Sequence, residues 1–83
     1  MPTISNFYGI VIVMFLKGKE HNPHIHAIMA ENEAPFLIET GELMEGDFPP
    51  KATEMVKEFI KTYKNELEEM WETETYVKLP PIV

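Results

Sequence analysis

The spacing of hydrophobic positions changes once along the chain, from short strand-like runs in the first half to helical spacing in the second. Residues 7–16 are rich in β-branched and aromatic side chains, and residues 24–31 and 34–40 form two further apolar runs. Short runs of this composition are typical of β-strands. A fourth, shorter strand is predicted at 42–45, so we expect a small antiparallel sheet of three to four strands.

Polar segments separate the predicted strands. Residues 17–20 predict a turn after the first strand. Residues 31–33 predict a tight hairpin between the second and third strands, in which Asn32 tolerates a positive φ. Gly41 marks a further turn before the fourth strand.

Helical spacing begins near residue 50, after two adjacent prolines that a first helical turn tolerates. Apolar side chains recur every three or four residues from Ala52 to Trp71, opposite a row of lysines and glutamates. This pattern predicts one amphipathic helix at about 50–72. The apolar tail at 76–83 contains two prolines that rule out a central strand, and we expect the tail to pack back over Trp71.

Together these elements predict an α+β fold of one domain, residues 1–83, with one long C-terminal helix packed on one face of the sheet. The first predicted strand is apolar on both of its faces. Because a single helix covers only one side of a small sheet, something else should cover the other side. The tail is one candidate. We favour a protein partner or a homo-oligomer, bound through the face without a helix.

Composition and charge narrow the choice of partner. The sequence has fourteen acidic residues, seven lysines and no arginine, which gives a net charge of −7. Lysine and arginine supply most contacts to nucleic acids, so we do not expect direct nucleic-acid binding. The lack of cysteine excludes disulfides and thiolate metal sites, and no apolar run reaches the ~18 residues that span a bilayer. Without a basic region before an apolar run at the N-terminus, we expect a cytoplasmic protein.

All three histidines of the chain fall within residues 21–26. His24 and His26 lie two residues apart in a predicted strand, so they share a face and their Cα atoms are ~6.6 Å apart. The alternate residues of this strand are apolar and belong under the helix, which places the two histidines on the face without a helix. With His21 as a third ligand they predict a metal site, because three nitrogens plus water are a common arrangement for catalytic zinc.

The sequence leaves two other roles for the histidines open. One is metal-free acid–base chemistry, as in a small ribonuclease-like toxin. The other is structural, with the histidines hydrogen-bonded to loop carbonyls beside Pro23. Glu20 or Glu39 is a candidate further ligand or general base for a metal site. The sequence names no catalytic residue and does not decide whether the protein is an enzyme; a divalent metal such as zinc is the one cofactor that it suggests.

Several sequence blocks, at 1–5, 7–10, 21–27 and 38–43, precede the single predicted helix with its Glu-rich end and Trp71. In this order, and over nearly the whole chain, they resemble the bacterial domain-of-unknown-function family 4160. The resemblance implies a small stand-alone bacterial protein, often encoded beside another small protein in a toxin–antitoxin-like pair. We therefore expect a protein-interaction module. The alternative is a metal-binding protein or metal-dependent hydrolase that uses the histidine cluster.

Overall fold

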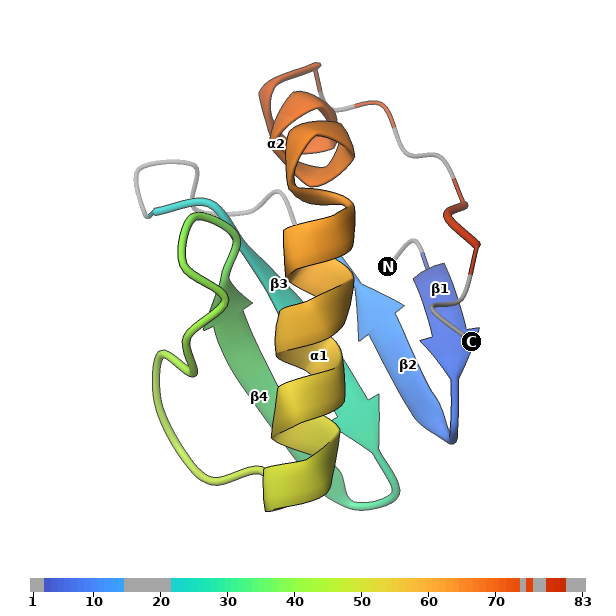
Figure 1. The fold of residues 1–83 in the computed structure, drawn as a ribbon, viewed down its shortest axis with the longest axis vertical. Coiled ribbons are helices and arrows are strands. Elements are labelled where there is room, and N and C mark those ends of the chain that lie inside the picture. Colours follow the sequence, from blue (N-terminus) through green and yellow to red (C-terminus); the bar gives the residue numbers. More distant parts are fainter. Residues whose placement is uncertain (1–2, 15–21, 74, 76–77, 81–83) are drawn as a thin grey trace.

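The computed structural model describes residues 3–14, 22–73, 75 and 78–80, and it has an α+β architecture of two layers (Figure 1). The strands are β1 (Thr3–Phe7), β2 (Ile10–Val13), β3 (His24–Met29) and β4 (Asn32–Leu37), and the helices are α1 (Pro50–Thr62) and α2 (Lys64–Thr73). The strands form one antiparallel sheet in the order β1-β2-β3-β4. The predicted α+β class and antiparallel sheet are therefore confirmed, and α1 lies across one face of the sheet (Figure 1).

The predicted strand at 7–16 is correct only for β2, because its first residue, Phe7, belongs to a separate strand, β1, that forms a hairpin with β2. Phe7 ends β1, Ile10 begins β2, and the two residues pair across a turn made by Tyr8 and Gly9. Their φ angles are 51° and 77°. Positive φ at both central residues is what the preferred two-residue hairpin turn requires, since its twist matches the twist of the strands. Residues 15 and 16 lie outside the described residues.

The hairpin between β3 and β4 turns one residue earlier than the predicted 31–33 connection. Ala30 and Glu31 make the turn, Ala30 has a φ of 54°, and Asn32 already pairs with Met29. This register places the alternate side chains of β4 that are apolar and buried on the same face as those of β3. A shift by one residue would turn both sets to opposite faces, so burial selects the earlier turn.

The predicted fourth strand at 42–45 is not a strand of the described structure. Leu43 makes a single bridge to Phe36, and the segment returns along the outer edge of β4. The N–H of Leu37 donates to the carbonyl of Glu42 at 2.9 Å, and that of Met44 donates to the carbonyl of Pro35 at 2.9 Å. The sheet reaches four strands because β1, at Thr3–Phe7, is a strand that the sequence did not predict.

The predicted single helix at 50–72 is instead two helices that meet at Tyr63. This residue has φ −113° and ψ 27°, outside the helical region, and α2 leaves in a different direction from α1 (Figure 1). Hydrogen bonds persist on both sides of the break, from Tyr63 N–H to Phe59 O (3.0 Å) and from Leu67 N–H to Tyr63 O (2.8 Å). In the described part of the chain, neither helix is long and apolar enough to cross a membrane.

The hydrophobic core lies between α1 and the sheet and continues under α2. Phe59 of α1 is fully buried, and its ring stacks on Phe7 of β1 with centroids 5.2 Å apart. Each fully buried side chain of this kind contributes ~1.5–3 kcal/mol. The core draws on every element: Ile4, Phe7, Ile10, Ile12, Ile25, Ala27, Ala34 and Phe36 from the strands, and Ala52, Val56, Phe59, Ile60, Leu67, Met70 and Trp71 from the helices.

The tail joins the other edge of the sheet. The N–H of Leu79 donates to the carbonyl of Ile4 in β1 at 2.8 Å, and the Leu79 side chain is partly buried against the core. The segment at 78–80 runs beside β1 (Figure 1). Of the tail predicted at 76–83, residues 76, 77 and 81–83 lie outside the described residues.

We expect Tyr8→Asn to stabilise the protein. A left-handed backbone costs most residues ~1–2 kcal/mol, and asparagine tolerates it better than tyrosine. Tyr8 is 61% exposed, so the substitution removes little packing. Urea unfolding should show a gain of up to ~1 kcal/mol. Met44→Asn, at the other large exposed apolar side chain, is the control and should give no such gain. Equal or lower stability of Tyr8→Asn would contradict the turn assignment.

Candidate functional site

The alternation of β3 places its histidines away from the core. Ile25 and Ala27 are fully buried on the face that packs against α1. His24 and His26 are half-buried on the opposite face, as the sequence predicted from the two-residue period of a strand. Burial of the intervening apolar residues therefore fixes the orientation of both imidazoles.

The strand register defines the rest of this opposite face, which we call the outer face. His26 lies between Val13 of β2 and Pro35 of β4, and His24 lies opposite Leu37. In the next row, Ile28 lies between Val11 and Glu33. Directly opposed residues of antiparallel strands share a face. The outer face thus includes Val11, Val13, His24, His26, Ile28, Glu33, Pro35 and Leu37, together with Thr3 and Asn6 of β1, which pair with Val13 and Val11. Of these side chains Val13 is buried.

A pocket of 390 Å³ lies on the outer face around the histidines. Its lining combines two imidazoles, two carboxylates and two apolar side chains: His24, His26, Glu33, Glu45, Pro35 and Met44. The segment that returns along β4 contributes Met44 and Glu45, since the backbone of Met44 is bonded to Pro35. The pocket therefore depends on three separate stretches of chain.

His24 has a structural role at the start of β3. Its Nδ1 lies 2.9 Å from the carbonyl oxygen of Asn22, which only accepts, so Nδ1 carries the proton and donates. The ring packs against Trp71 of α2, with centroids 5.2 Å apart, and against His26 at 5.3 Å. Trp71 is buried, so His24 ties α2 to the end of the sheet.

His26 pairs with Glu33 across the hairpin. Its Nδ1 lies 3.1 Å from Glu33 Oε2, and the side chains are 24% and 51% exposed. An exposed pair of this kind contributes only ~0.2–1 kcal/mol, so its main effect is to orient the imidazole. Glu33 is not among the site residues predicted from the sequence. The hairpin register would have found it, because Glu33 lies diagonally across from His26 on the same face.

The three-histidine metal site stays a prediction. The structure brings His24 and His26 together, whereas His21 lies outside the described residues, as does Glu20. Within the described ranges, no group of three or more histidine and carboxylate side chains is arranged to hold one ion. These ranges therefore supply a pair of imidazoles with two carboxylates around them.

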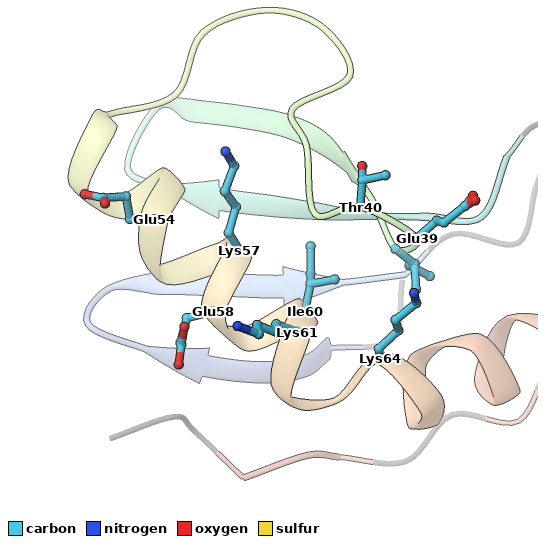
Figure 2. A pocket seen from close by; sticks show the side chains of 9 residues that line it. Glu39, Thr40, Glu54, Lys57, Glu58, Ile60, Lys61 and Lys64 are labelled. Carbon is cyan, nitrogen blue, oxygen red and sulfur yellow. The ribbon is translucent and has the colours of Figure 1, made fainter.

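Glu39, the other carboxylate predicted near the histidines, lines a different pocket. This pocket of 380 Å³ lies between α1 and the turn that follows β4 (Figure 2). Figure 2 shows three lysines, Lys57 and Lys61 on α1 and Lys64 at the start of α2, with Glu39 and Thr40 on the turn. Three glutamates and three lysines line it, so their formal charges cancel and favour neither an anion nor a cation.

A sequence comparison assigns the chain to a family. The model of a domain of unknown function (DUF4160) matches residues 9–72, which is most of the chain and includes β2, β3, β4, α1 and all but the end of α2. No curated protein and no solved structure matches. The comparison therefore fixes the family and adds no activity to the geometry of the outer face.

We expect the two histidines to differ in their effect on stability. His24→Ala removes a hydrogen bond worth ~0.5–1.5 kcal/mol and an aromatic contact of similar size, so it should cost ~1–3 kcal/mol. His26→Ala removes a more exposed pair and should cost less than ~1 kcal/mol. Both histidines lie on β3, so replacing either by alanine changes the strand propensity by the same amount, and the difference between the variants reports the lost contacts. Urea unfolding of both variants checks the order, and equal costs would contradict the structural role of His24.

Proposed function

The chain belongs to this family of unknown function, and we propose that it is a protein-interaction module that docks a partner on its outer face. The observation that carries the proposal is a contrast between the edges and the face of the sheet. Among the described residues, backbone hydrogen bonds within the chain cover part of both edges, two between β4 and the segment that returns along it and one on β1. The outer face carries partly exposed apolar side chains from three strands.

The edges of the sheet offer little to an incoming strand. On β4, Pro35 lacks an N–H and its carbonyl already accepts from Met44, while Leu37 donates to Glu42. On β1, the carbonyl of Ile4 accepts from Leu79. Proline and covering segments are common ways to block edge-to-edge pairing. A partner that adds a strand is thereby disfavoured, which leaves docking against a face.

The outer face has the apolar content that such docking needs. Val11, Ile28, Pro35 and Leu37 are all partly exposed. Val11 and Ile28 lie directly opposite each other on β2 and β3. Contiguous apolar side chains within a polar rim are typical of protein interaction sites.

The charges around this face favour a partner with basic side chains over a second copy of the chain. Glu33 and Glu45 line the pocket, and the whole chain carries a net charge of −7. Two copies docked through this face would bring like charges together, which costs binding energy, whereas lysine or arginine on a different protein would be attracted. A stable pair with one other small protein, as in toxin–antitoxin systems, is the form of the proposal that suits a chain of 83 residues with one docking face.

Photo-crosslinking from chosen positions tests where a partner binds and what it is. A photoreactive residue in place of Ile28 on the outer face should give one cross-linked product in cells. The same residue in place of Glu58, exposed on α1, is the control and should not give this product. Mass spectrometry should identify a chain other than this one. A product only of twice the chain's own mass, or equal products at both sites, would overturn the proposal.

The purified complex allows a quantitative prediction. Ile28→Asp places a charge beside Val11 on the outer face and should weaken binding at least ~10-fold, equivalent to ~1.4 kcal/mol. Glu33→Lys should also weaken binding, and the loss should be larger at low salt than at high salt, because ions screen the repulsion between the new lysine and a basic partner. Isothermal titration calorimetry measures both, with Glu58→Gln as the matched control and circular dichroism to verify folding. Unchanged affinity in Ile28→Asp would exclude the outer face.

A further inference from the structure

We propose that His24 and His26 bind a divalent transition-metal ion of the zinc class through their Nε2 atoms, in the pocket on the outer face. The site lies in a pocket of the proposed docking face, but it needs only side chains of this chain, so it can be tested without a partner. It rests on three observations: the hydrogen bonds of the two Nδ1 atoms, the spacing of the two rings, and the charges that line the pocket.

Both imidazoles are hydrogen-bonded in the way that metal-ligating histidines are. His24 donates from Nδ1 to the carbonyl of Asn22, and His26 Nδ1 lies 3.1 Å from Glu33 Oε2, where an ionised carboxylate accepts. A ring with its proton on Nδ1 carries its lone pair on Nε2. Histidines in metal sites almost always hold their second nitrogen on a carbonyl or carboxylate, which fixes the tautomer and raises ligand basicity.

The spacing of the two rings matches that of two imidazoles on one ion. A zinc–nitrogen bond is ~2.0–2.1 Å, so two rings on a tetrahedral ion have centroids ~5 Å apart. The centroids of His24 and His26 are 5.3 Å apart. Packing of His24 against buried Trp71 and the bond between His26 and Glu33 hold the rings near this distance.

The pocket also has the charge and ligand chemistry of such an ion. Two carboxylates, Glu33 and Glu45, line it beside the imidazoles, and both attract a cation. Imidazole nitrogen favours zinc, copper and nickel over magnesium and calcium, which prefer oxygen. Within the described residues no third ligand is in place, and the proposal needs only the two imidazoles from this part of the chain.

Trp71 gives a direct signal for this site, because it is the only tryptophan of the chain and packs on His24. Titration of tag-free protein with Cu²⁺ should quench its fluorescence saturably at one equivalent, and a chelator should reverse the effect. His26→Gln keeps the contact between His24 and Trp71, and it should raise the midpoint at least ~10-fold. Glu33→Gln removes only the orienting carboxylate and should weaken binding ~10–100-fold.

A second measurement locates the ion on the nitrogen atoms. On addition of Zn²⁺, ¹⁵N NMR of the imidazoles should show large shifts at Nε2 of both histidines and smaller shifts at Nδ1. His21→Gln is the matched control, since it removes the one histidine outside the pair. Binding that persists in His21→Gln and fails in His26→Gln assigns the ion to the pair. Quenching without saturation, or binding that His26→Gln leaves unchanged, would overturn the proposal whatever the outcome of the partner experiments.

Discussion

The packing of α1 on one face of the sheet is the interaction on which the rest of the structure depends. Phe59 lies within it, fully buried, with its ring 5.2 Å from Phe7 and 5.1 Å from Tyr63. Because side chains alternate along a strand, burial of one set under the helix turns the other set outward. His24 and His26 therefore owe their place on the outer face to their apolar neighbours in β3. The site is a consequence of core packing as much as of its own residues.

The sequence predicted the change from strands to helix along the chain better than the number and limits of the elements. Tyr8 and Gly9 lie between apolar residues and replace two strand positions, so the apolar run continues through the turn and resembles one long strand. An aromatic residue at positive φ is uncommon, and tyrosine gives no local sign of a turn. The break at Tyr63 is hidden for a similar reason, because buried positions recur at helical spacing from Ile60 to Leu67 across it. In both places tertiary packing determines where the element ends, and the spacing of apolar residues along the sequence does not show this.

The candidate site divides in the same way. His24 and His26 followed from the two-residue period of β3 alone. Glu33 required the hairpin register, and the predicted turn at 31–33 would have made it a turn residue rather than a member of the outer face. Glu45 required a backbone hydrogen bond between segments distant from β3. Strand periodicity is thus enough to predict the position of the two histidines. Glu33 depends on the hairpin register, and Glu45 depends on the segment that returns along β4.

The two proposals share one pocket, and this makes them energetically linked. A basic side chain of a partner would be attracted by Glu33 and Glu45, and so would a metal ion held by the two imidazoles. Occupation by the ion adds positive charge beside both carboxylates and lowers their attraction for lysine or arginine. By thermodynamic reciprocity, a bound basic partner must then lower the affinity for the ion by the same factor. The linkage reverses if the partner presents a carboxylate or histidine to the open positions of the ion, so the sign of the coupling reports which groups of the partner enter the pocket.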